Sequence, residues 1–324
     1  MRTKRSLFFF LLLGVTAACV SSAPDFNFHD GGPTPPTSET GPADARISDA
    51  GPCNVNEPFK RSPNQPFRNL NTSTSQVGAS LSPDELTVYY DDGRKLFTAT
   101  RTDIGKPFEN AHPLPMEDGG CKNYGLPAVT NDEKRLFFQC SNDDDQTTSI
   151  RTMTRGERGQ TFGNLQDVRF DLPTLFKSFP RLYESQGRVE LWSSVTDADT
   201  GSRNGDQIYQ LVSTDGGAGF GAATPRDDLN DENTGDSFAV LTPDGLQVYF
   251  ASGRADIMNA DIYVATRPNT NARFQDITHV DALSDINGDD APNWISPDGC
   301  RLYYFSSRAG GAGGYDLYLA ERPK

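Results

Sequence analysis

Two aspartates are the side chains of this 324-residue chain best suited to acid–base chemistry. Asp236 and Asp290 each stand eight residues before a tight Pro-Asp turn. Two carboxylates at a suitable separation can act as the acid and the base of glycoside hydrolysis. The equivalent offset before three other turns is occupied by Gln76, Tyr124 and Ser178. Because these five positions are chemically mixed, hydrolysis by Asp236 and Asp290 is the second interpretation of the site.

Two arginines recur at matching places in the chain. Arg254 and Arg308 are each followed within a few residues by an aspartate, Asp261 in the first case and Asp316 in the second. A guanidinium and a carboxylate in neighbouring strands form strong charge-assisted hydrogen bonds. We therefore expect structural ion pairs between Arg254 and Asp261 and between Arg308 and Asp316, with ligand contact as the alternative.

Several short segments combine aspartate, asparagine and glycine. The candidate binding residues in them are Asp143, Asp144, Asp197 and Asp199. The segment that begins at Asp197 could chelate Ca²⁺, because hard cations take several oxygens from closely spaced acidic and amide side chains. It lacks the alternation and the terminal glutamate of an EF-hand loop. Solvated turns are therefore the favoured interpretation, and no cofactor is predicted.

The cysteines divide into one N-terminal residue, Cys19, and four others that allow three pairings. Cys121 and Cys140 flank two strands of one predicted unit, so we expect them to form a disulfide. Cys53 would then pair with Cys300. Four free thiols are the alternative. Metal ligation is disfavoured, because the chain has no Cys-x-x-Cys pair and its three histidines are scattered.

These residues are positioned by an internal repeat of about 50 residues, a period typical of radial β-strand arrays. A strand of similar sequence recurs five times, beginning at Lys95, Ser149, Gln207, Asp261 and Asp316. Seven residues after the first four strands comes a phenylalanine, at Phe108, Phe162, Phe220 and Phe274. A tight turn recurs at Asp84, Asp132, Gln186, Asp244 and Asp298, and an aromatic residue stands six residues beyond it, at Tyr90, Phe138, Trp192, Phe250 and Tyr304. Aromatic side chains in one register suit the layer between stacked sheets.

The repeat predicts an all-β propeller of four-stranded blades over residues 57–324. The fifth copy ends after its third strand, and Phe59 lies 25 residues before Asp84, close to the 24-residue step between the other phenylalanines and their next turns. Residues 57–72 are therefore expected to complete blade five. This closure gives a five-bladed ring without an open sheet edge. Six blades are the alternative, if residues 53–75 contain more than one strand.

The segments Ser296–Arg308 and Gly314–Tyr318 resemble the WD40-like repeats of the PD40 type, which also form the propeller of the periplasmic protein TolB. The resemblance extends over about residues 57–324 and is strongest in the last two copies. It implies a propeller fold and is uninformative about activity. We see no counterpart of the separate α/β domain of TolB, so a TolB-type role is not expected.

The first 19 residues are predicted to be a targeting segment. A basic start precedes the apolar run Leu7–Leu13, which is too short to span a membrane. Thr16-Ala-Ala-Cys19 resembles the lipobox of bacterial lipoproteins, which implies acylation of Cys19. Val20 then favours sorting to the outer membrane. Residues 20–56 are rich in Pro, Gly, Ser and Asp and are predicted to form a disordered tether. The alternative is a secreted protein cleaved after Ala23.

Composition and loop variation lead to the functional expectation. The net charge of −14 and the lack of a basic stripe disfavour binding to nucleic acid or directly to anionic lipid. Length variation between repeats falls in the loop between the second and third strands of each blade, and loops on a rigid scaffold commonly carry binding specificity. We therefore expect a monomeric, non-enzymatic module that binds an envelope protein or a glycan, with a glycan hydrolase as the alternative.

Overall fold

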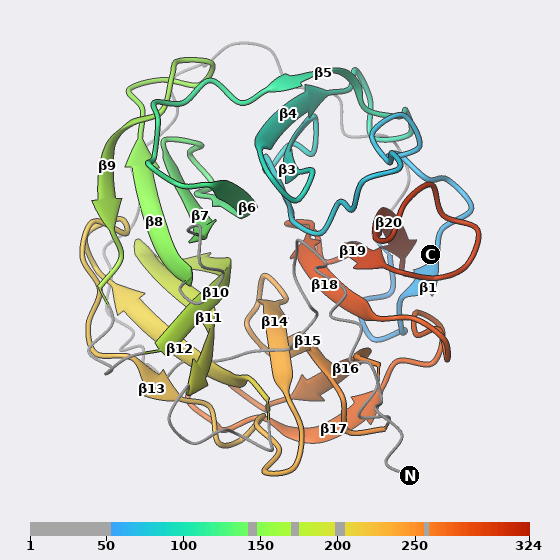
Figure 1. Cartoon of the computed structure of the whole chain (residues 1–324). Helices are drawn as coiled ribbons and strands as arrows, with labels where there is room; N and C mark the ends of the chain where they lie inside the picture. The colour runs from blue at the N-terminus through green and yellow to red at the C-terminus, as the bar shows by residue number, and fades with distance from the viewer. Residues whose placement is uncertain (1–52, 142–147, 170–174, 198–204, 256–258) are drawn as a thin grey trace, which may run out of the picture.

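The computed structural model describes residues 53–141, 148–169, 175–197, 205–255 and 259–324. Every regular element within these ranges is a β-strand, and the strands form five antiparallel sheets arranged as blades around a central axis (Figure 1). Strands β6, β14 and β18 lie near the axis, while β5, β9, β13 and β17 lie at the rim (Figure 1). The predicted five-bladed propeller is confirmed. In the described part of the chain we find no helix with the length and apolarity of a membrane span.

Each blade has four strands, which we call a to d from the axis outwards. Blade one comprises β2 (Ala79–Leu81), β3 (Thr87–Asp91), β4 (Leu96–Thr100) and β5 (Glu109–Pro113). Blade two comprises β6 (Asn123–Val129), β7 (Arg135–Ser141), β8 (Thr148–Thr154) and β9 (Gly163–Asp167). Blade three comprises β10 (Leu175–Ser185), β11 (Arg188–Asp197), β12 (Gln207–Ser213) and β13 (Thr224–Pro225). Blade four comprises β14 (Asp236–Leu241), β15 (Gln247–Ser252), β16 (Asp261–Thr266) and β17 (Gln275–His279).

Blade five joins the two ends of the described chain. Its strands are β18 (Asp290–Ile295), β19 (Arg301–Ser306), β20 (Asp316–Glu321) and, as strand d, β1 (Lys60–Arg61). Lys60 pairs with Glu321 and Arg61 with Ala320 in an antiparallel register. The N-terminal segment therefore closes the ring as the repeat spacing predicts. The edge of β20, which would otherwise be open to another strand, is covered.

A repeated arginine–phenylalanine stack accompanies the seven-residue step after strand c in blades one, two and four. In blade one, the Arg101 guanidinium lies 4.5 Å from the Phe108 ring centroid, and its Nε donates a 2.7 Å hydrogen bond to the Glu85 carbonyl in the a–b turn. The same stack recurs at 4.3 Å for Arg155 and Phe162, 4.4 Å for Arg267 and Phe274, and 4.5 Å for Arg322 and Phe59. Cation–π contacts of this kind are strongest where water is excluded. In blades one, two and four the stack thus ties strands c and d to the a–b turn.

Blade three departs from the repeat in two ways. Its strand c ends at Ser213, so it lacks the arginine of the other blades, and Asp215 instead accepts backbone hydrogen bonds from Ala218 and Gly219. In addition, Trp192 packs between blades three and four, whereas Phe250 and its equivalents pack against the preceding blade. The predicted register is therefore wrong for this copy.

The cause of the shifted register is a longer hairpin. Val129 pairs with Leu136 in blade two, seven residues apart (136 − 129), but Leu182 pairs with Leu191 in blade three, nine residues apart (191 − 182). Trp192 consequently pairs with Arg181 and takes the place that Phe137 has in blade two. Since successive side chains of a strand point to opposite faces, this shift turns Trp192 toward blade four.

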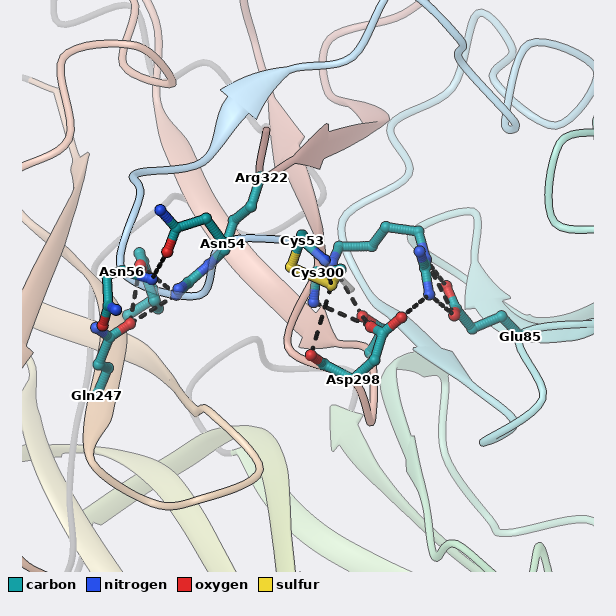
Figure 2. Close-up of a disulfide and its surroundings, with 11 residues drawn as sticks. Cys53, Asn54, Asn56, Glu85, Gln247, Asp298, Cys300 and Arg322 are labelled. Atoms are coloured by element: carbon teal, nitrogen blue, oxygen red, sulfur yellow. Dashed lines mark hydrogen bonds and ion pairs between the residues drawn. A yellow bond between two sulfur atoms is a disulfide. The ribbon is translucent and has the colours of Figure 1, made fainter. Parts of the chain in front are cut away.

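The structure has one long-range and one local disulfide. Cys53 and Cys300 are bonded across 247 residues, next to the ring closure, where the backbone NH of Asn54 donates a 2.9 Å hydrogen bond to the carbonyl of Pro323 (Figure 2). Cys121 and Cys140 are bonded across 19 residues within blade two. The pairing in the purified protein stays a prediction, which peptide mapping tests.

Candidate functional site

The b–c loops and the d–a crossings meet on one face of the ring, which we call the loop face. Four of the predicted functional residues, Cys19, Asp143, Asp144 and Asp199, lie outside the described residues. Asp197 is the last residue of β11, and its side chain is likewise not described. The remaining candidates, Asp236, Asp290, Arg254 and Arg308, are all placed and form the best-defined polar arrangement on this face.

Asp290 and Arg308 form a closed unit at the loop-face end of blade five. The Arg308 Nη2 lies 2.6 Å from Asp290 Oδ1 and also donates to the carbonyl oxygen of Leu283, in the crossing from blade four. Its Nε donates a 2.7 Å hydrogen bond to Ser306 Oγ at the end of β19. The second carboxylate oxygen of Asp290 accepts the backbone NH of Asp285 at 2.7 Å. One arginine thus holds strand a, strand b and the incoming crossing together.

Blade four repeats this unit. Arg254 Nη2 lies 2.6 Å from Asp236 Oδ1 and 2.8 Å from the Leu229 carbonyl oxygen, and the backbone NH of Asp231 donates to Asp236 Oδ2 at 2.6 Å. The Arg254 guanidinium also lies 5.1 Å from the ring centroid of Phe250. We call these two arrangements the arginine clamps.

The partners of the arginines differ from those predicted. The expectation that Arg254 pairs with Asp261 and Arg308 with Asp316 is wrong, because each arginine instead reaches the first residue of its strand a. Asp316 accepts the backbone NH of Ala312 at 2.6 Å, and Asp261 lies 3.2 Å from a ring nitrogen of His279. The true partners are 18 residues before each arginine, and the hairpin fold of strands a and b brings them together.

Burial decides the electrostatics of both carboxylates. Asp236 is 1% exposed and Asp290 is 0% exposed. Burial raises the pKa of Asp290 to about 6, while the Arg308 charge acts in the opposite direction. Burial likewise raises the pKa of Asp236, against the charge of Arg254. Because Oδ1 and Oδ2 of both residues accept hydrogen bonds from the protein, the clamps have a structural role and neither carboxylate faces solvent.

The residues at the equivalent offset before the three other turns also make local contacts. The Gln76 side chain donates to the hydroxyls of Thr72 and Thr74, each at 2.9 Å. The Tyr124 hydroxyl donates a 2.7 Å hydrogen bond to Asp118. Ser178 accepts the Ser193 hydroxyl at its backbone carbonyl. These side chains do not add a further acid to Asp236 and Asp290.

Two buried acids of the loop face were not recognised from the sequence. Asp91 ends β3, is 1% exposed and accepts backbone hydrogen bonds from Gly78, Gly93 and Leu126 at 2.8–3.0 Å. Burial raises its pKa to about 6. Asp206, just before β12, is 1% exposed, and burial raises its pKa well above the ordinary value. The sequence places both in acidic turns, where nothing distinguishes a buried carboxylate from a solvated one.

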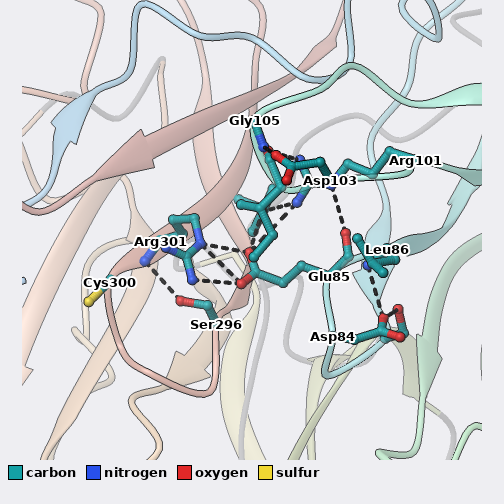
Figure 3. Close-up of polar contacts among 12 residues, drawn as sticks. Asp84, Glu85, Leu86, Arg101, Asp103, Gly105, Ser296, Cys300 and Arg301 are labelled. Atoms are coloured by element: carbon teal, nitrogen blue, oxygen red, sulfur yellow. Dashed lines mark hydrogen bonds and ion pairs between the residues drawn. The ribbon is translucent and has the colours of Figure 1, made fainter. Parts of the chain in front are cut away.

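A second acidic cluster lies at the a–b turn of blade one. Arg301 donates from Nε and Nη2 to the Glu85 carboxylate at 2.7–3.0 Å, and the hydroxyl of Tyr303 donates to the same carboxylate (Figure 3). Arg101 Nη2 lies 3.8 Å from Glu85 Oε2. Glu85 is 2% exposed and joins blade one to blade five. Arg101 and Arg301 balance the charge of the Glu85 carboxylate. This cluster therefore serves as a junction between the two blades. Among the described residues, no group of three or more His, Cys, Asp and Glu side chains could hold a metal ion.

Comparison of the sequence with family models and with curated proteins finds no match. Among solved structures, a thermostable family-43 glycoside hydrolase aligns with a TM-score of 0.50 at 13% identity, covering 76% of this chain and 91% of that one. A family 117 glycoside hydrolase from Zobellia galactanivorans gives 0.49 at 11% identity, covering 82% and 89%. TolB from Acinetobacter baumannii gives 0.44 at 16% identity, covering 77% and 55%. The likeness is one of fold. At these identities it shows the fold alone.

Proposed function

We propose that the protein is a non-enzymatic binding or scaffold module that acts through the loop face of its propeller. The observation that carries the proposal is the pair of arginine clamps. The carboxylates best placed for catalysis, Asp236 and Asp290, are buried and occupied by Arg254, Arg308 and backbone NH groups. The same clamps brace the d–a crossings beside the b–c loops, which suits a rigid platform for recognition.

The proposed partner is an envelope protein or a glycan, and the proposed location is the outer membrane, through acylation of Cys19. The support is the sequence Thr16-Ala-Ala-Cys19 after a basic start and a short apolar run. Mass spectrometry of the mature N-terminus should find an acylated cysteine, and Cys19→Ala should release the protein from the membrane fraction. A soluble product that begins at Pro24 would show secretion instead.

Partner capture from envelopes tests the binding role. The comparison uses the intact protein, a variant whose segments 142–147 and 198–204 are replaced by Gly-Ser linkers, and a control variant with the same replacement at 157–160 in the c–d loop of the opposite face. We expect partners recovered by the intact protein and by the control to be lost from the loop-face variant. Recovery of the same partners by all three proteins would contradict the loop-face assignment.

A glycan hydrolase that uses Asp236 and Asp290 is the second candidate. The observation in its favour is the pKa of Asp290, raised to about 6 by burial, which lies in the range useful for a general acid near neutral pH. A panel of glycan substrates separates the two functions. Turnover that disappears in both Asp236→Asn and Asp290→Asn, while both variants keep the thermal stability of the parent, would establish the hydrolase.

A further inference from the structure

A buried arginine occupies an unusual place in the inner strand of blade three. Arg181 pairs with Trp192 across strands a and b, where blade two has Ala128 opposite Phe137 and blade four has Val240 opposite Tyr249. Arg181 is 3% exposed. A charged side chain therefore takes a place that two other blades fill with an alkyl group. Arginine is almost never fully buried unless it is paired.

The contacts of Arg181 leave part of its donor capacity unused. Its Nη1 donates a 2.9 Å hydrogen bond to the Pro180 carbonyl, its Nη2 donates to Asn293 Oδ1, and the guanidinium lies 5.1 Å from the Phe238 ring centroid. Within the described part of the chain, Nε of Arg181 and Nδ2 of Asn293 are buried without a hydrogen-bond partner. Burial lowers the pKa of Arg181 to about 9, opposed by the charge of Asp91, so the group is a cation at neutral pH.

These two side chains line a cavity of ≈ 50 Å³ in the centre of the ring. Its other walls come from the second halves of the inner strands, including Leu182, Leu241 and Trp294. The cavity therefore lies toward the a–b turns, on the side of the ring opposite the loop face. The wall combines apolar side chains with convergent polar groups, as small-molecule sites do.

One carboxyl group also lines this cavity. Glu184 accepts the backbone NH of Asn131 at 2.6 Å, and burial raises its pKa to about 7. No ion pair joins Glu184 to Arg181 among the described residues, and Asp132 is the neighbouring charge that further raises the pKa of Glu184. Protonation of Glu184 lets it donate a hydrogen bond, so it need not repel an anion in the cavity.

We propose that this cavity binds a small monovalent carboxylate, held by the guanidinium of Arg181 and the side-chain amide of Asn293. Arginine presents a planar set of donors that matches a carboxylate, and the amide NH₂ adds a further donor. A cavity needs roughly 10–15 Å³ to hold one water molecule, so the available space suits a ligand of about the size of acetate. This anion would supply the counter-charge that Arg181 does not find within ion-pair distance.

Acetate is the probe for this site. Isothermal titration calorimetry and Tm are measured at constant ionic strength, with sodium gluconate as the replacement salt, because gluconate carries a carboxylate but is too large for the cavity. We expect one saturable acetate site per chain and a Tm that rises with acetate to a plateau. No saturable binding of acetate, or saturable binding of chloride without binding of acetate, would overturn the proposal.

Two variants locate the binding. Arg181→Met keeps a long side chain without the charge and should lose acetate binding at least tenfold. Asn293→Asp places a carboxylate beside the guanidinium, so it should raise Tm without acetate and abolish the response to acetate. Acetate binding that is unchanged in either variant would place the anion elsewhere and refute the assignment.

Discussion

At the scale of single residues, the propeller uses arginine to satisfy buried polar groups that its sheets leave at both faces. Arg308 serves Asp290, Ser306 and the Leu283 carbonyl on the loop face, whereas Arg101 serves the Glu85 carbonyl at the opposite turn. A guanidinium suits both places because it has five donors in a fixed plane and remains charged when partly desolvated. These two arginines are therefore parts of the protein's framework.

Removing one member of an arginine clamp should be costly. Arg308→Met leaves Asp290 buried without its counter-charge, and the loss of unfolding free energy should reach about 3–5 kcal/mol at pH 8. The loss should be smaller at pH 5, because the Asp290 carboxyl can then be protonated in the folded state. Urea unfolding at the two pH values measures the effect. Lys134→Met, at the exposed pair with Glu157, is the control and should change stability by less than about 0.5 kcal/mol.

The contribution of Asp91 to the free energy of unfolding should decrease as the pH rises from about 4 to about 6. Its pKa is about 6 in the folded protein against an ordinary 3.8, so the folded state binds more protons in this interval. The contribution of Asp91 to stability is thus largest at low pH and is lost as pH rises through 6, by up to about 3 kcal/mol. The measurement is the free energy of unfolding of the parent minus that of Asp91→Asn across this range. A difference that grows with rising pH would contradict the burial of an ionisable Asp91.

At the scale of the elements, contacts at the strand ends help to hold blades three and five together, in addition to the hydrogen bonds between their strands. Strand d is short in blades three and five, with two residues in each of β13 and β1. In blade five the short ladder between β1 and β20 is supplemented by Phe59, which is fully buried and stacks under Arg322. In blade three the corresponding arginine is absent. The chain after strand c is instead held by Asp215, which accepts the backbone NH groups of Ala218 and Gly219.

Phe59 should be essential to the closure of the ring. Phe59→Ala should cost about 3–5 kcal/mol of unfolding free energy, as other buried phenylalanine truncations do, and should expose β20 to hydrogen exchange. Phe108→Ala is the matched control, since Phe108 is equally buried and stacks under Arg101 but belongs to a blade continuous in sequence. Equal protection of β20 in the two variants would show that β1 stays attached without Phe59.

At the scale of the whole molecule, the two disulfides should differ in their contribution to stability. The chain-entropy treatment gives about 5 kcal/mol for the 247-residue separation of Cys53 and Cys300, and about 3 kcal/mol for the 19-residue separation of Cys121 and Cys140. Replacing each pair by alanine should therefore lower the midpoint of urea unfolding more for the ring-closing pair. Peptide mapping under non-reducing conditions checks the pairing first. Four thiols that react with an alkylating reagent in the native protein would exclude both bonds.

The architecture of this protein follows from its sequence alone, because it rests on local and repeated signals. Turn residues, alternating strands and the step from Arg101 to Phe108 recur at constant spacing, and the leftover Phe59 predicts which segment completes the last blade. Each of these features is specified within one repeat, so its period can be read without knowing the fold.

Only the tertiary structure decides how the polar side chains are used. The partner of Arg308 is Asp290, not the nearer Asp316, because the hairpin of strands a and b brings residues 18 apart into contact. Trp192 faces blade four because one hairpin is two residues longer, and a strand reverses its faces with every single-residue shift. The cavity beside Arg181 depends on several inner strands meeting at the axis, and no single repeat encodes that convergence.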